Sequence, residues 1–232
     1  MNSNETMRKF AVIDGFYLKL IAVITMVIDH VGMAFFPDDN IFRIIGRIAF
    51  PIYCFLIVEG FFYTKNVGKY IGRLTIFAIV SELPFDMVAN NAWIDLTSQN
   101  VFFTLLIGLL TIYFINRQFN EMMKSVILII GMLVSILLMT DYTCYGVALI
   151  YVFYLLRDRR VMACVLMALM SVVMGPTQGF AVLAALPIML YSGRKGPKLA
   201  DNGIVKYGFY VVYPLHLLII FMVKLYLTSI AG

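Results

Sequence analysis

An aspartate and a histidine stand side by side in an otherwise apolar segment. Asp29 and His30 end a mostly apolar run that begins at Leu20. Burying an ionised aspartate at the centre of a membrane helix costs about 2.5–3.5 kcal/mol unless it is paired or hydrated. Histidine ionises near neutral pH and is the commonest general base. Because Asp29 is adjacent to His30, we expect it to face an arginine or a partner on a neighbouring helix.

The second histidine of the chain, His216, lies near the middle of the last apolar segment, just after Pro214. A proline frees a backbone carbonyl, which is common where a helix lines a cavity. His216 therefore has two open interpretations, a hydrogen bond that links helices or a role in chemistry.

Other polar residues are predicted at a similar membrane depth. Arg43 and Arg47 have the i, i+4 spacing that places both guanidinium groups on one helix face. Further polar side chains are expected in the same layer: Ser81, Glu82, Asn100, Thr104, Tyr142 and Tyr145. Two interpretations remain open, a buried ion-pair network that holds the helices together and a functional site.

A separate charged group follows the second apolar segment. It comprises Glu59, Lys65, Lys69 and Arg73, the last of which lies inside an apolar segment. Ordinary loop charge with side chains reaching to the membrane surface is one interpretation. The other is a basic mouth for a phosphorylated cytosolic cofactor, with Arg73 as the strongest candidate.

The composition defines the class of protein that must position these residues. Of 232 residues, 62% are hydrophobic and 13% charged, whereas soluble domains carry about 25% charged residues. This composition predicts an integral membrane protein, and we expect residues 1–232 to form a single membrane domain. The net charge of +5 is attributed to cytoplasmic loops, with no nucleic acid partner. The three cysteines show no CxxC spacing and predict neither a disulfide framework nor a metal site.

Hydrophobic runs and their breaks predict an all-α fold, a polytopic membrane helix bundle of about nine transmembrane helices. The predicted segments are approximately 16–36, 41–63, 69–88, 100–116, 124–140, 143–156, 160–175, 178–191 and 204–227. The sixth to eighth segments are short, so two of them could be half-helices or re-entrant.

Loop charges alternate along the chain. The N-terminal segment carries Arg8 and Lys9, and every even-numbered loop contains basic residues, whereas the odd-numbered loops contain none. The eighth loop holds Arg194, Lys195, Lys198 and Lys206. Positive charge marks cytoplasmic loops, so the N-terminus is predicted to be cytoplasmic. Asp29, His30, Arg43, Arg47, Glu82 and Asn100 then fall near the outer face.

Five stretches carry distinctive motifs: KLIAVITMVIDHVG, RIIGRIAFPIYCFLIVEGFFYT, YIGRLTIFAIVSELPFD, QNVFFTLLIGLL and KYGFYVVYPLHLL. In this order they resemble the TraX family of bacterial membrane proteins, which is named for a conjugation protein that acetylates pilin. The resemblance implies a multi-pass protein of the bacterial plasma membrane that transfers an acyl group, expected to be acetyl, from cytosolic acetyl-CoA. The acceptor at the outer face would be a peptide amine or a hydroxyl group of a glycan or lipid.

The resemblance also implies roles for the polar residues. His30 is expected to be the base for the acceptor, with Asp29 orienting or tuning the site, and His216 a rival base or transient acyl carrier. Arg47 and Glu82 are assigned to the catalytic set, and Arg43, Asn100, Ser81 and Tyr213 to acceptor binding. Arg73, Lys69, Lys65 and Glu59 are assigned to acetyl-CoA, and no residue to a metal.

Two other functions remain open. A transporter or proton-coupled flippase could use the same charged layer, although no inverted repeat is visible. A non-catalytic scaffold of a pilus or a conjugation or export machine is the third possibility.

Overall fold

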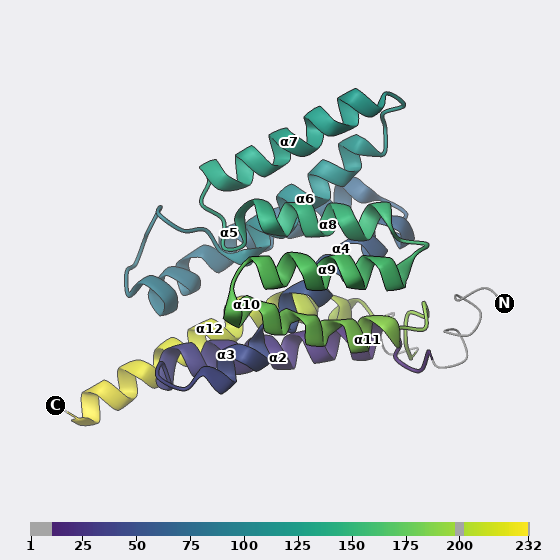
Figure 1. The fold of residues 1–232 in the computed structure, drawn as a ribbon. Helices are drawn as coiled ribbons and strands as arrows, with labels where there is room; N and C mark the ends of the chain where they lie inside the picture. The colour runs from purple at the N-terminus through teal and green to yellow at the C-terminus, as the bar shows by residue number, and fades with distance from the viewer. Residues whose placement is uncertain (1–10, 198–201, 232) are drawn as a thin grey trace. The chain divides into compact units, whose positions relative to one another are not determined.

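The computed structural model describes residues 11–197 and 202–231, and within these ranges the regular secondary structure is helical, apart from two isolated backbone bridges (Figure 1). The predicted all-α fold is therefore confirmed over these ranges. Arg8, Lys9 and Lys198, on which part of the loop-charge pattern rests, lie outside the described residues.

The chain divides into two compact units. The first unit contains residues 11–53, 158–197 and 202–231, and the second contains Cys54–Arg157. The first unit holds α2 (Gly15–Phe35), α3 (Asn40–Gly46), α9 (Arg160–Val173), α10 (Pro176–Gly179), the 3-10 helix η2 (Phe180–Ala184), α11 (Ala185–Met189) and α12 (Gly203–Ala231). The second holds α5 (Val67–Phe85), the π-helix η1 (Asp86–Asn90), α6 (Val101–Ile115), α7 (Glu121–Leu137) and α8 (Thr143–Leu155), and α4 (Ala49–Tyr63) begins in the first unit and ends in the second.

Short polar side chains define where several helices begin. Asp14, Asp39, Asn66, Asn100 and Asn120 each accept a hydrogen bond from a backbone N–H in the first turn of the following helix. Such a cap satisfies a donor that has no partner within the helix. The starts of α2, α3, α5, α6 and α7 are thus encoded locally.

The second and eighth predicted segments are each interrupted in the structure. The segment 41–63 breaks after Gly46, and Pro51 explains the break because it cannot donate a hydrogen bond to the carbonyl of Arg47. The segment 178–191 is divided between α10, η2 and α11, and Pro187 likewise removes the donor that would reach Leu183.

Three helical stretches are long and apolar enough to cross a membrane: Gly15–Phe35, Asn40–Tyr63 and Gly203–Ile230. Four further apolar helices are shorter, Val101–Ile115, Thr143–Leu155, Arg160–Val173 and Pro176–Met189. A hydrocarbon core is about 30 Å thick and a helix rises about 1.5 Å per residue. The helical character of the membrane protein is established, whereas the count of nine spans stays a prediction.

Small residues set the helix spacing in the second unit, where α6 packs against α5, α7 and α8. A β-carbon at Gly108 of α6 would overlap the side chain of Ile150 in α8. One at Gly131 of α7 would overlap Thr111 of α6. Glycines at such contacts let helix backbones approach closely, as in membrane bundles.

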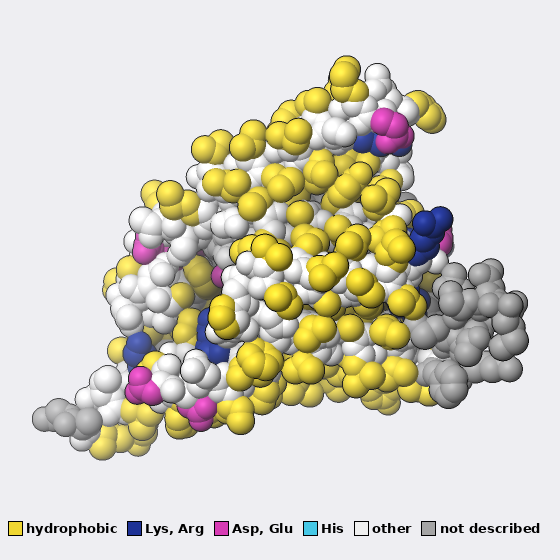
Figure 2. All heavy atoms as spheres, viewed as in Figure 1, with side chains coloured by type: hydrophobic (Ala, Val, Ile, Leu, Met, Phe, Trp, Pro, Cys, Tyr) yellow, Lys and Arg dark blue, Asp and Glu magenta, His cyan; other side chains and the backbone are white. Residues whose placement is uncertain are grey.

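The outward faces of the helices are apolar. In α7, Ile129, Ile130, Leu133 and Leu137 each expose half or more of their surface. Hydrophobic side chains spread over α7 in Figure 2 and, in the other unit, over α9. Apolar surface on this scale is unusual for a soluble monomer and is suited to contact with lipid.

Candidate functional site

Asp29 lies against two arginines in the first unit. Arg47 Nη2 donates to both carboxylate oxygens of Asp29, at 3.0 and 2.9 Å, and Arg43 Nη1 lies 3.0 Å from Oδ2. Only 13% of the Asp29 side chain is exposed. The expectation that Asp29 faces an arginine is confirmed, and the i, i+4 pair does present both guanidinium groups to one partner.

Glycine at position 46 makes this ion cluster possible. A β-carbon on Gly46 would overlap the Asp29 side chain, and one on Gly32 would overlap Phe42. Helices α2 and α3 therefore touch through glycine, with Asp29 seated directly on the backbone of α3. The short loop between them ends at the Asp39 cap.

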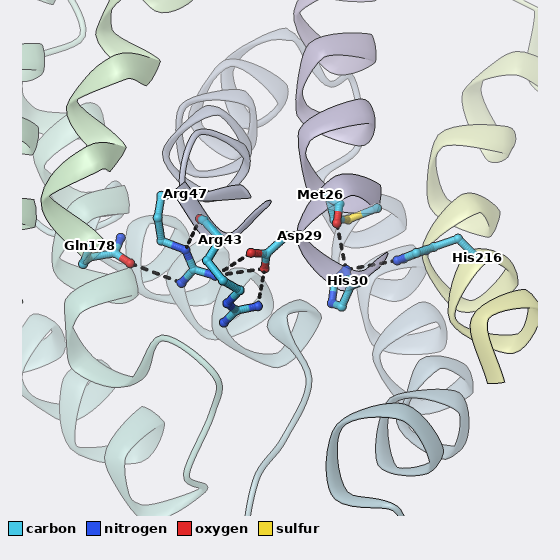
Figure 3. A network of polar contacts seen from close by, with 7 residues as sticks. All are labelled: Met26, Asp29, His30, Arg43, Arg47, Gln178 and His216. Atoms are coloured by element: carbon cyan, nitrogen blue, oxygen red, sulfur yellow. Dashed lines mark hydrogen bonds and ion pairs between the residues drawn. The ribbon is translucent and has the colours of Figure 1, made fainter. Parts of the chain in front are cut away.

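Arg47 is held by further contacts that the sequence reasoning missed. Its Nη1 donates to Gln178 Oε1 at 3.4 Å, and its Nε donates to the carbonyl of Arg43 at 3.3 Å (Figure 3). Gln178 stands at the start of the predicted segment 178–191, and the sequence predicted no role for it. Its distance of 131 positions from Arg47 left no local signal.

An open pocket of about 570 Å³ adjoins the ion cluster. Met33, Pro37 and Asn40 line it together with Arg43 and Arg47. The segment Met174, Gly175, Pro176, Thr177 and Gln178 completes the lining. Both arginines of the predicted site thus reach a concave surface of the size range of small-molecule pockets.

The two histidines of the chain meet on the other side of α2. His30 Nδ1 lies 3.1 Å from His216 Nε2 on α12, and the ring centroids are 4.9 Å apart. Tyr213 packs edge-on against both rings, at 5.9 Å from His30 and 5.6 Å from His216. The structure therefore brings His30 next to Tyr213 and His216, which lie more than 180 positions further along the sequence.

The hydrogen-bond network assigns the ring protons. His216 Nδ1 lies 2.8 Å from the carbonyl oxygen of Val212, which can only accept, so this nitrogen carries a proton and Nε2 carries a lone pair. His30 Nδ1 faces that lone pair and also the carbonyl of Met26 at 2.9 Å, so it must donate. In the neutral ring, His30 Nε2 then carries a lone pair, and it makes no hydrogen bond to a residue described in the structure.

Asp29 and His30 belong to different clusters although they are neighbours in sequence. In Figure 3 the Asp29 carboxylate points toward Arg43 and Arg47, while the His30 ring points toward His216. Within residues 11–197 and 202–231, the hydrogen bonds of Asp29 go to Arg47 and its other ion-pair partner is Arg43. A direct contact through which Asp29 would orient His30 is not found there.

Glu82, Asn100 and Ser81 lie in the second unit. Glu82 Oε2 accepts hydrogen bonds from the backbone and side-chain nitrogens of Asn100, whose side chain also donates to the carbonyl of Ala78. Asn100 Oδ1 caps α6 by accepting from Phe102. Glu82 Oε1 and Ser81 Oγ are buried and have no hydrogen-bond partner among the described residues. Glu82 and Asn100, which were predicted to share one polar layer, are thus in direct contact.

The predicted cofactor-binding residues also lie in the second unit, and two of them have partners. Glu59 forms an ion pair with Arg157 at 3.1 Å. The Arg157 guanidinium stacks at 4.1 Å over the ring of Phe62, and that of Arg73 lies 5.7 Å from the ring of Tyr70. Arg157 was not among the residues predicted from the sequence to form a site.

Lys65 and Lys69 have exposed side chains at the start of α5. Arg73 is half-buried, and its Nε is buried without a hydrogen-bond partner in the described part of the chain. A guanidinium nitrogen in this state can donate to an incoming anion. The structure therefore leaves Arg73 the candidate that the sequence made strongest.

Comparison with known proteins places the chain among its relatives. The TraX protein family profile matches residues 15–224. A protein named "Probable fimbrial assembly protein FimC, serogroup H1" from Dichelobacter nodosus is 29% identical over 92% of this chain and 96% of its own length. An uncharacterised protein of Rickettsia prowazekii is 28% identical over 45% of this chain and 38% of its own. No solved structure matches. With a family match over nearly its whole length and apolar helices throughout, this chain is a membrane protein that belongs to the TraX family.

Proposed function

We propose that this protein is a membrane acyltransferase that moves an acetyl group from cytosolic acetyl-CoA to an amine or hydroxyl acceptor at the extracytoplasmic side. The observation that carries the proposal is the His30–His216 pair, which leaves a lone pair on His30 Nε2. Acyl transfer needs a base for the nucleophile and donors for the charge that develops on the carbonyl oxygen.

In the proposed reaction, His30 Nε2 takes the proton from the acceptor N–H or O–H while the acceptor attacks the thioester carbonyl carbon. The carbon–sulfur bond then breaks, and the leaving thiolate takes the proton back from His30. The histidine cation formed in between would be stabilised by the hydrogen bonds from Nδ1 to Met26 and His216, because bonds to a charged donor are stronger.

His216 would act as a positioning residue in this scheme. Its Nε2, the atom that an acyl carrier would use, already accepts a hydrogen bond from His30. This geometry favours direct transfer over an acyl-histidine intermediate. Tyr213 would support the pair through its ring contacts.

The donor would bind among the basic residues of the second unit. Arg73 has an unpartnered buried Nε, and Lys65 and Lys69 are exposed close to it in sequence. The phosphates of acetyl-CoA need several such cations. Glu59 would serve indirectly, by holding Arg157 through their ion pair.

The proposal includes a single multi-pass domain of about nine membrane segments in the bacterial plasma membrane, with a cytoplasmic N-terminus. The alternation of basic loops supports this topology. Labelling of single cysteines from outside intact cells tests it, because residues near Asp38 should react and residues near Lys65 should not.

The central experiment compares the purified full-length protein with its His30→Ala variant. Wild-type protein should hydrolyse or exchange acetyl-CoA, and His30→Ala should lower the rate by about 10²–10⁴-fold. The melting temperature in detergent reports whether the variant is folded. Full activity in a folded His30→Ala protein would remove His30 as the base, and mass spectrometry of cells with and without the gene would identify the acceptor.

A second candidate is a non-catalytic role in pilus assembly, which the name of the Dichelobacter nodosus relative favours. Deletion of the gene would then impair assembly, and the His30→Ala protein would restore it fully. Under the acyltransferase proposal the same variant would fail to restore acetylation of the acceptor.

A further inference from the structure

The pocket beside the ion cluster carries an uncompensated positive charge. Arg43 and Arg47 both line it, and Asp29 supplies one negative charge against their two positive charges. The nearby acids of the preceding loop, Asp38 and Asp39, are outside the pocket lining, and Asp39 is engaged in capping α3. One positive charge therefore remains for a ligand to neutralise.

The two arginines differ in how many of their guanidinium nitrogens are bonded and in how exposed their side chains are. Arg47 uses all three guanidinium nitrogens, on Asp29, Gln178 and the carbonyl of Arg43, and 13% of its side chain is exposed. Arg43 contacts Asp29 through Nη1, and the structure records no bond of its other two guanidinium nitrogens to a described residue. With 33% of its side chain exposed, Arg43 is the arginine open to the pocket.

The rest of the lining suits a ligand with a charged head and an apolar body. Asn40 and Thr177 add polar side chains to the lining, and Met33, Met174 and Pro176 add apolar surface. Arginine binds carboxylate and phosphate groups with two parallel hydrogen bonds. Charged and polar groups that converge on a pocket in this way orient small ligands.

We propose that this pocket binds the acceptor through an oxyanion group, a carboxylate or a phosphate, held by Arg43. The assignment to the acceptor rests on the proposed function, whereas the binding of an oxyanion does not. Arg47 is the positioning residue that holds Asp29 and, through it, Arg43. The acceptor therefore carries a carboxylate or a phosphate. A neutral sugar, or a peptide amine without such a group nearby, does not fit.

The test measures binding of inorganic phosphate and of acetate to the full-length protein in uncharged detergent by isothermal titration, without acetyl-CoA. At least one of the two anions should bind the wild type at one site. Binding should fall at least tenfold in Arg43→Gln, and Arg43→Lys should recover part of it. Arg117→Gln is the matched control, because it removes the same charge from an arginine stacked on Tyr113 in the second unit; it should bind as the wild type does.

A second variant guards against misfolding of Arg43→Gln. Thr177→Trp narrows the pocket without replacing a residue of the ion cluster, and it should also weaken anion binding. Unchanged binding in folded Arg43→Gln and Thr177→Trp proteins would overturn the proposal.

A further experiment distinguishes an oxyanion group of the acceptor from the phosphates of CoA. Addition of CoA should leave Arg43-dependent phosphate or acetate binding unchanged. Displacement of the anion by CoA would place the donor's phosphates in the pocket and overturn the assignment to the acceptor. If the wild-type protein binds the anion through Arg43 but transfers no acetyl group, the proposed function is contradicted and the binding of an oxyanion is not.

Discussion

Two groups of polar residues differ in kind although each includes a residue of α2. One is the ion cluster, formed by Asp29, Arg43, Arg47 and Gln178, and the other is the histidine pair, formed by His30 and His216. The ion cluster is charged, and the bonds of Arg47 reach three different partners. In the histidine pair, with both rings neutral, His30 donates to His216 and His216 donates to the carbonyl of Val212, which leaves a free lone pair on His30 Nε2. Successive residues of an α-helix point about 100° apart, so adjacent positions serve different neighbours. The ion cluster links α2 to α3 and, under the proposed function, presents Arg43 to a ligand, while the histidine pair would supply the base.

The largest effect on stability is expected from Asp29→Asn. The change leaves two guanidinium groups beside each other without a counter-charge, and removal of one member of a buried ion pair typically costs about 3–5 kcal/mol. Denaturant titration in detergent micelles measures the loss of unfolding free energy. Asp38→Asn, which removes the same charge from an exposed loop residue, should change stability little. Equal stability of the two variants would contradict the structural role of the ion cluster.

A smaller loss is expected from Gly46→Ala. The added methyl group overlaps the Asp29 side chain, and overpacking of a well-packed contact costs about 1–3 kcal/mol. Gly208→Ala in α12 is the matched control, because no atom within 4 Å meets its added carbon. The control should be neutral or stabilised by up to about 1 kcal/mol, since alanine favours a helix over glycine. If Gly46→Ala behaves as its control does, α2 and α3 are not in the contact described.

The smallest effect on stability is expected from His216→Phe. It removes the hydrogen bond with His30 and the one within its own helix to the carbonyl of Val212, and it keeps an aromatic ring, so the cost should be about 1 kcal/mol. The catalytic rate should nevertheless fall while the KM for acetyl-CoA stays unchanged.

His216→Gln sharpens this result, because its amide oxygen can still accept from His30. Partial recovery of the rate in His216→Gln supports a positioning role. Equal inactivity of His216→Phe and His216→Gln would instead indicate that His216 reacts directly, as a base or an acyl carrier.

Patterns of few residues were enough to predict several features. The apolar runs predicted helices, and the cost of a buried Asp29 predicted an arginine partner, which the structure supplies twice. The i, i+4 spacing of Arg43 and Arg47 predicted their common face. These inferences succeed because they depend on local geometry and on the price of an unpaired charge, both of which are fixed by residue type.

Other features depended on contacts between distant segments. The partners Gln178 of Arg47 and Arg157 of Glu59 were not predicted, because each lies about 100 positions or more from its partner. Glu82 and Asn100 belong to the second unit and Asp29 to the first, so their common layer stays a prediction. Depth along a membrane helix can be estimated from loop charges, but the identity of the neighbouring helix cannot.

By itself, the sequence determined that this chain is a helical membrane protein with a costly polar pair at positions 29 and 30. Composition and hydrophobic length suffice for that, because lipid leaves the helix as the simplest way to satisfy every backbone group. Only the tertiary structure decided that Asp29 meets arginines while His30 meets His216. That choice depends on which helices pack against each face of α2, and glycines at 32 and 46 and the approach of α12 settle it through close packing.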